Sequence, residues 1–137
     1  MKVVGTYRHT LDVKNRLAMP VQFRSALGEV FYCMKGPDKC LFVYDEEGWE
    51  HVTAQLSQKS TSRDSRNRQR HSFGGAFMPE PDKQGRFIIP QEMIAYAELK
   101  KDVVVFGCDT RIEIWDSEEW DTMMKAPVEG EFDDIIW

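Results

Sequence analysis

The chain has 137 residues, of which 42% are hydrophobic and 12% aromatic, so it is long enough to bury one sizeable core. Its net charge of -5 argues against a surface that coats nucleic acid everywhere, although a local basic patch remains compatible with that charge. No stretch approaches the ~20 apolar residues of a membrane helix, and the opening "MKVVGTYRHT" lacks the apolar run of a secretory signal. We therefore expect a cytoplasmic globular protein without a membrane partner.

An internal repeat divides the chain. A shift of 70 residues places Asp12 on Asp82, Arg16 on Arg86 and Pro20 on Pro90. A shift of 71 places "GPDKCLFVYDEEGWE" (36–50) on "GCDTRIEIWDSEEWD" (107–121). Because the substitutions keep size and polarity, the pattern indicates two copies of one unit, with a connection between them and a tail after them.

The first copy predicts a strand at "GTYRHTLDV", a turn at "DVKN" and a returning strand at "RLAMP". Pro20 suits the first turn of a helix, in which Phe23, Ala26 and Leu27 form one apolar stripe that ends at Gly28. The runs "VFYCM" and "CLFVY" predict two further strands around a turn at "KGPDK".

The second copy predicts strands at "RFIIP", "VVVFG" and "RIEIW", and a helix at "PQEMIAYAELKK" with lysines in its last turn. Each copy ends in a helix, with Asp45 or Asp116 as the N-cap and Trp49 or Trp120 as a core anchor. Four short strands per copy are too few to hide their edges. We therefore expect an α+β, mainly β protein whose two halves intertwine into one pseudo-twofold, small barrel-like core with flanking helices.

The two repeated turns share an aspartate followed by a residue suited to positive φ. That residue is Asn15 in the first turn and Gly85 in the second, and both types tolerate the left-handed region. Asp12 and Asp82 can accept backbone hydrogen bonds across the turns. These four residues are predicted to shape the turns.

The arginine after each turn, Arg16 or Arg86, has two interpretations. It could form an exposed salt bridge to the aspartate four residues earlier, worth only ~0–1 kcal/mol. Alternatively, the turn presents its guanidinium group, with Lys14 and Lys83 nearby, to phosphate or guanine. Repetition favours the second interpretation, because two matching basic hairpins could contact DNA side by side. Neighbours of the first hairpin could widen the patch: Arg8, His9 and Arg24.

Two further segments have strongly uneven charge. The linker "KSTSRDSRNRQR" could be the solvated face of a helix opened by Thr61 or Ser62, or it could add phosphate contacts through its arginines at 63–70. The tail "PVEGEFDDIIW" mixes acids with large apolar residues, so it could dock on another subunit or protein, or form a disordered end.

Catalytic and metal-binding patterns are not apparent. Cys33, Cys40 and Cys108 form no CxxC pair and lie in apolar runs, so buried thiols are expected in place of disulfides or zinc ligands. The three histidines are far apart, and no Walker, GxGxxG, HExxH or GxSxG motif occurs. The acids at 45–47 precede a helix, where they stabilise its dipole. We expect a protein that is not an enzyme and needs no cofactor or metal.

The motifs "HTLDVKNRLAMPVQFR", "GPDKCLFVYDEEGW", "DKQGRFIIPQEM" and "DTRIEIWDSEEW" resemble the MraZ family of bacterial transcription regulators, from about residue 5 to 124. The resemblance implies two tandem SpoVT/AbrB-like swapped-hairpin units. Their expected bounds are 5–50 for the first unit, 51–76 for a helical linker, 77–124 for the second unit and 125–137 for an acidic tail. The linker departs from the family, because it is rich in arginine and serine where an apolar helix face is usual.

The resemblance also implies a function. It suggests a sequence-specific DNA-binding repressor of the division and cell-wall gene cluster, which binds direct repeats in the promoter upstream of its own gene. The expected assembly is a homo-oligomeric ring, an octamer or dodecamer, associated with the nucleoid and without a small-molecule ligand. The family's D-x-x-x-R motifs fall on Asp12 with Arg16 and on Asp82 with Arg86. The arginines inherit DNA contact, together with Lys14, Lys83 and Arg8 as neighbours.

Overall fold

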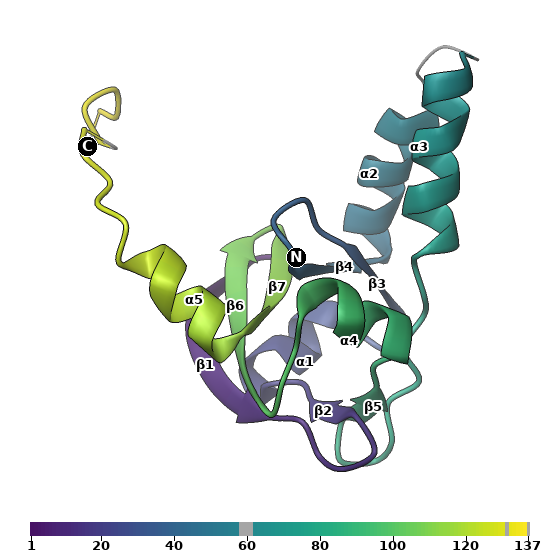
Figure 1. Ribbon diagram of the computed structural model, residues 1–137, viewed down its shortest axis with the longest axis vertical. Coiled ribbons are helices and arrows are strands. Elements are labelled where there is room, and N and C mark those ends of the chain that lie inside the picture. Colours follow the sequence, from purple (N-terminus) through teal and green to yellow (C-terminus); the bar gives the residue numbers. More distant parts are fainter. Residues whose placement is uncertain (58–61, 131, 137) are drawn as a thin grey trace.

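The computed structural model describes residues 1–57, 62–130 and 132–136, and shows a mixed α+β protein built mainly on antiparallel sheet (Figure 1). None of the helices in these ranges is long and apolar enough to cross a bilayer. Along the chain the elements are β1 (Val3–Thr10), β2 (Arg16–Ala18), α1 (Val21–Leu27), β3 (Phe31–Lys35), β4 (Leu41–Asp45), α2 (Glu46–Ser57), α3 (Arg63–Gly74), β5 (Arg86–Ile88), α4 (Gln91–Ala97), β6 (Asp102–Asp109), β7 (Arg111–Asp116) and α5 (Ser117–Met124).

The sheet is open. Five strands pair in the order β1-β6-β7-β4-β3, while β2 and β5 form a separate two-stranded ribbon. The expected barrel-like core is therefore wrong, because β1 and β3 lie at opposite edges of the larger sheet. The ribbon has only three residues in each strand and does not join those edges by strand pairing.

Strand pairing crosses between the two halves of the chain. β1, which precedes the first turn, pairs with β6, and Phe77, which precedes the second turn, forms a bridge with Cys33 in β3. After the turns, β2 pairs with β5. The predicted return of "RLAMP" against the preceding strand is wrong, because β1 pairs with β6 and β2 pairs with β5, where Leu17 lies opposite its repeat equivalent Phe87.

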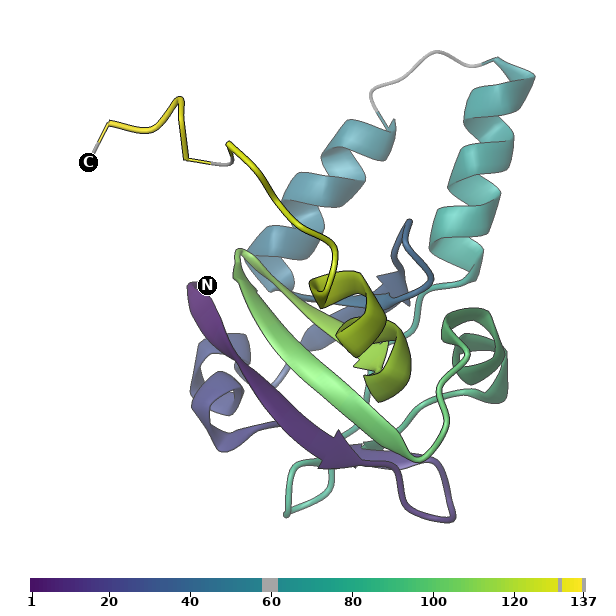
Figure 2. The ribbon, with the colours of Figure 1, turned by 60° about the vertical axis from the view of Figure 1, so that its left-hand side comes forward.

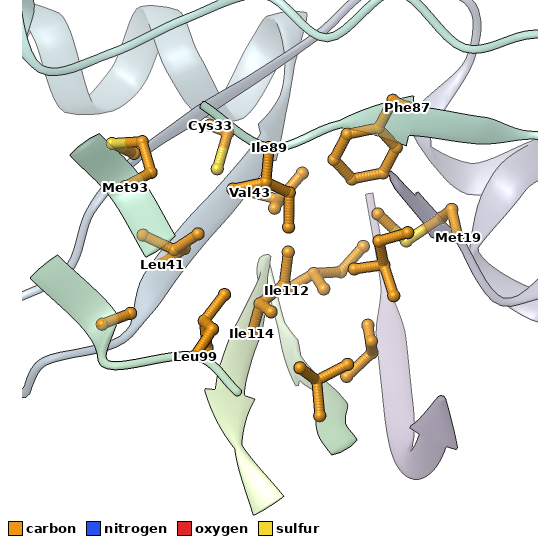
Figure 3. Close-up of a cluster of buried hydrophobic side chains, with 14 of the residues drawn as sticks. Met19, Cys33, Leu41, Val43, Phe87, Ile89, Met93, Leu99, Ile112 and Ile114 are labelled. Carbon is orange, nitrogen blue, oxygen red and sulfur yellow. The ribbon is translucent and has the colours of Figure 1, made fainter. Parts of the chain in front are cut away.

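The core is assembled from both halves (Figure 3). Leu17 and Phe87 are fully buried in the ribbon, and they meet apolar side chains from β4 and β7 in one cluster. Burying a side chain of this size contributes about 1.5–3 kcal/mol. Further members of the cluster come from both repeats: Met19, Cys33, Leu41, Val43, Ile89, Met93, Leu99, Ile112 and Ile114. Neither half could complete this core alone.

The two short helices, α1 and α4, end differently from one another. α1 ends at Gly28, with φ of 75°, as predicted. The prediction that α4 carries lysines in its last turn is wrong, because the helix stops at Ala97 and Glu98 adopts φ of 52°. The backbone N–H of Leu99 then donates to the carbonyl of Ile94 at 3.0 Å, which turns Leu99 back into the core.

The helices that end each repeat also differ. Both begin with the predicted aspartate: the Gly48 N–H donates to Asp45 Oδ1 at 2.8 Å, and Glu118 N–H donates to Asp116 Oδ2 at 3.2 Å. Trp120 of α5 is buried, which confirms it as a core anchor. The same prediction for Trp49 is wrong. It is half-buried and stacks on Tyr32 at the foot of the α2–α3 hairpin, which stands away from the sheet (Figure 1).

Cys33 lies in β3, Cys108 lies in β6 and Cys40 immediately precedes β4. Cys33 and Cys40 are buried, as predicted, while Cys108 is half-buried. Burial raises the pKa of the Cys40 thiol to about 12, and burial also raises the pKa of Cys33. These two thiols therefore behave as small apolar side chains.

Candidate nucleic-acid interface

The two repeated turns lie next to each other at one end of the molecule (Figure 2). The β2–β5 ribbon holds them there, and two reciprocal backbone hydrogen bonds extend it. Met19 N–H donates to the carbonyl of Gly85 at 3.2 Å, and Ile89 N–H donates to the carbonyl of Asn15 at 2.9 Å. Met19, which follows β2, therefore holds the second turn, and Ile89, which follows β5, holds the first turn.

The first turn is organised by the carboxylate of Asp12. Its Oδ1 accepts the backbone N–H groups of Lys14 and Arg16, both at 2.9 Å, and its Oδ2 accepts Nε of Arg16 at 2.6 Å. Asn15 N–H donates to the Asp12 carbonyl at 3.0 Å, and Asn15 has φ of 59°. One carboxylate therefore fixes both the backbone and the arginine.

The second turn repeats this geometry around Asp82. Its Oδ1 accepts the backbone N–H groups of Gln84 and Arg86 at 2.9 Å, and its Oδ2 accepts Nε of Arg86 at 2.9 Å. Gly85 N–H donates to the Asp82 carbonyl at 3.0 Å, with φ of 76°. The two turns are structural copies despite the change from Asn to Gly.

Salt bridge and presentation turn out to be compatible roles for each arginine. Hydrogen bonds lower the pKa of Asp12 and of Asp82, with the backbone N–H of Arg16 or Arg86 as the largest cause, so both carboxylates stay ionised at neutral pH. Within each guanidinium group, the carboxylate engages only Nε. Within the described residues the terminal nitrogens of Arg16 and Arg86 make no hydrogen bond, and the side chains are 29% and 37% exposed. Two oriented guanidinium forks therefore remain available to a ligand.

Lysines accompany both arginines, at positions that are not equivalent. Lys14 is the third residue of its turn and Lys83 is the second of its own, and both are exposed. Val13, at the tip of the first turn, is fully exposed. The two tips therefore offer positive charge at slightly different places on the same end of the molecule.

Arg24 follows the first hairpin in the sequence, but its guanidinium lies against the second turn. It projects from α1, and its Nε donates to the carbonyl of Met19, which follows β2, at 2.8 Å. A Cβ atom at Gly85 would lie 2.5 Å from its guanidinium. A side chain at position 85 would therefore collide with Arg24, whereas glycine leaves room for it.

Arg8 lies elsewhere. It projects from β1 to α5, where its guanidinium forms an ion pair with Asp121 at 2.7 Å and donates to Ser117 Oγ at 2.9 Å. These contacts raise the pKa of Arg8, with the Asp121 hydrogen bond as the largest cause. A DNA contact by Arg8 would require this ion pair to open. His9, one residue further along β1, is half-buried.

The other charged segments are exposed. α3 carries its arginines on the surface, and Ser62 caps it by accepting the Ser65 N–H at 3.2 Å, while Thr61 lies outside the described residues. The described tail residues beyond Lys125 are also exposed. No group of three or more His, Cys, Asp and Glu side chains in the described part of the chain is placed to hold a metal ion.

Comparison with known proteins assigns a family. The family model described as "MraZ protein, putative antitoxin-like" matches residues 3–71 and 72–134. Proteins named transcriptional regulator MraZ are similar to this chain in Finegoldia magna, with 46% identity over 86% of this chain and 83% of the relative, and in Acetivibrio thermocellus, with 45% identity over the same shares. The relative of that name from Desulforamulus reducens is 43% identical over 96% of this chain and 93% of its own length. The chain therefore belongs to the MraZ family.

Proposed function

We propose that this protein is a sequence-specific DNA-binding transcriptional regulator that contacts double-stranded DNA through its paired turns. Its relatives are named transcriptional regulators. The observation that carries the proposal is the pair of matched Asp–Arg turns, which lie next to each other and in which no described residue occupies the terminal nitrogens of Arg16 and Arg86. It acts in the cytoplasm, at the nucleoid.

The physical argument concerns preorganisation. A guanidinium fork matches phosphate oxygens and the O6/N7 edge of guanine, but an unrestrained arginine loses rotamer entropy when it binds. Here the aspartate already fixes Nε, so less freedom is lost on contact. Lys14, Lys83 and Arg24 add charge around the forks. Phosphate contacts then supply most of the affinity, and arginines that reach base edges supply selectivity.

The proposed assembly is a homo-oligomeric ring, an octamer or dodecamer, that places several pairs of turns along direct repeats. The sites lie upstream of its own gene in the division and cell-wall cluster, where binding represses transcription. Repeated contact favours such an arrangement, because linked binding events raise the apparent affinity without new kinds of contact.

The proposed organisation of the chain follows the SpoVT/AbrB-like interpretation. Residues 5–50 and 77–124 form the two swapped-hairpin units, 51–76 the helical linker and 125–137 the acidic tail. The crossed pairing of β1 with β6 and of Phe77 with Cys33 supports a swapped arrangement.

Footprinting of the purified protein on the DNA upstream of its own gene tests this function. We expect protected direct repeats, and a native mass that is a multiple of the chain mass in the same sample. Protection of no site by a protein of intact fold and assembly would contradict sequence-specific binding. A monomeric mass with normal footprints would contradict the ring alone.

A further inference from the structure

α3 is a strongly basic helix that contains four arginines. Arg63, Arg66 and Arg70 follow the spacing i, i+3, i+7, which places them on one side of the helix, while Arg68 is exposed on a different side. Asp64 is the only acid in the helix. Arg70 donates to Asn67 at 2.8 Å, and within the described residues it forms no ion pair, as is also true of Arg63 and Arg68.

This face lies far from the turns. The α2–α3 hairpin stands at the end of the molecule opposite the β2–β5 ribbon and its turns (Figure 1). Twelve helical residues extend α3 by about 18 Å along its axis. DNA bound at the turns of one chain would therefore lie at the end of the molecule opposite that chain's arginine face. We therefore expect the face to bind a different partner.

The same chain contains a segment of opposite charge. Residues 127–137 carry Glu129, Glu131, Asp133 and Asp134 and no basic residue. Among the described members, Glu129, Asp133 and Asp134 are exposed and form no ion pair with described residues. The neighbouring apolar side chains of Ile135 and Ile136 are also exposed, Ile136 almost fully.

The helical hairpin offers matching apolar surface next to its arginines. Phe73 of α3 is 38% exposed and packs edge-on against Trp49 of α2, with 6.2 Å between the ring centroids. Leu56 is half-buried, and its carbonyl accepts Nε2 of Gln69 at 3.1 Å. Guanidinium groups beside apolar surface form a site for a segment that contains both carboxylates and large apolar residues.

We propose that residues 127–137 of one copy dock on the arginine face of α3 in a second copy of the chain. Charge complementarity identifies the occupant. Within one chain the described part of the segment, 127–130 and 132–136, lies away from α3 in both views (Figures 1 and 2), which favours a neighbouring copy. This proposal depends on the proposed function in one respect: the self-association proposed there brings the two copies together.

A labelled peptide of residues 125–137 tests the docking surface. The receptor is the full-length chain with E129Q, E131Q, D133N and D134N, because its neutral tail does not compete for the face. We expect saturable binding that weakens with salt and that falls on the order of tenfold when Arg63→Gln, Arg66→Gln and Arg70→Gln are added. The matched control, Lys14→Gln with Lys83→Gln, should bind the peptide as before.

The outcomes separate the alternatives. Absence of peptide binding, or unchanged binding to the α3 variant, overturns the proposal. Loss of binding in the lysine control instead places the tail at the turns. If the α3 substitutions weaken DNA binding and flatten its salt dependence without changing peptide binding, the face serves nucleic acid and the proposal fails.

A cross-linking experiment tests whether the partner is a second copy. A photoreactive amino acid replaces Phe132 in the full chain, and equal amounts of light and ¹⁵N-labelled protein are mixed, dissociated and reassembled before irradiation. We expect mixed-isotope links between the tail and α3. Links within one isotope only would show docking in the same chain and overturn the second-copy claim. DNA binding by the turns is measured separately on the same sample. Failure of the proposed DNA binding can therefore be distinguished from failure of the proposed tail docking.

Discussion

The two turns have nearly the same backbone and hydrogen bonds, yet their surroundings differ. In each, one aspartate accepts two backbone N–H groups and the Nε of an arginine. The residue with positive φ is Asn15 in one and Gly85 in the other. The comparison shows that the repeat preserves the turn, whereas the helix packed against each turn determines which residue fits there.

The helices explain that difference. Position 24 of α1 corresponds to position 94 of α4 in the repeat, and these are Arg24 and Ile94. Arg24 covers the second turn and fills the space of a side chain at Gly85. Ile94 is buried, and the Asn15 side chain is accommodated, with its Nδ2 3.4 Å from Oε1 of Gln91. Two nearly identical turns therefore have different neighbours: the Asn15 amide lies near Arg16 in the first turn, and the Arg24 guanidinium lies near Arg86 in the second.

The largest expected effects come from the residues that join the turns to the core. Phe87→Ala should lower the free energy of unfolding by about 3–5 kcal/mol and Leu17→Ala by about 2–5 kcal/mol, because both are buried in the ribbon. Urea unfolding followed by circular dichroism measures both. Ile88→Ala is the matched control in the same ribbon, since Ile88 is exposed, and its cost should stay within about 0.5 kcal/mol. Equal small costs for all three would contradict a shared core.

A smaller difference should separate the positive-φ positions. Gly85→Ala places a Cβ in the left-handed region and against Arg24, so it should cost at least about 1–2 kcal/mol. Asn15→Gly keeps a permissive residue and should change stability by less than about 0.5 kcal/mol. Thermal unfolding in a double-mutant cycle with Arg24→Ala should recover part of the Gly85→Ala loss. Purely additive effects would show that the Arg24 contact is unimportant.

The smallest effects concern the pH dependence of the two aspartates. Because folding lowers the pKa of Asp12 and Asp82, their stabilisation is present above the ordinary carboxyl pKa of about 3.9 and is lost as pH falls through the lower folded-state values. Asp12→Asn with Asp82→Asn should therefore flatten the acid side of the stability profile below about pH 4. Urea midpoints across this range measure it, with Asp134→Asn in the tail as control. Superimposable profiles for wild type and the double variant would refute the assignment.

Local features of the fold could be predicted from the sequence, while pairing between distant segments was harder. The start of α1 after Pro20, its end at Gly28 and the Asp116 cap follow from short-range rules. The open sheet and the pairing of β2 with β5 depend on contacts about seventy residues apart, which periodicity does not specify. The early end of α4 required knowing that Leu99 is buried.

At the candidate site, too, local features could be predicted from the sequence and tertiary contacts could not. Repetition and residue type were enough to select Asp12, Arg16, Asp82 and Arg86, and the structure brings their turns together. The sequence could not show that Arg24 crosses to the opposite turn or that Arg8 is paired with Asp121, because both contacts depend on tertiary packing. The predicted salt bridge is confirmed at both turns, while contact of the two arginines with DNA stays a prediction.

The most direct test of the central claim is the salt dependence of DNA affinity for Arg16→Ala, Arg86→Ala and the double variant. We predict that each single change weakens binding by about 1–3 kcal/mol if its guanidinium reads a base, or reduces the salt slope by about one if it contacts phosphate, with the greatest loss in the double variant. Arg63→Ala with Arg70→Ala on α3 should leave both quantities unchanged. Affinity and slope of the turn variants equal to those of the wild type would contradict DNA binding by the paired turns.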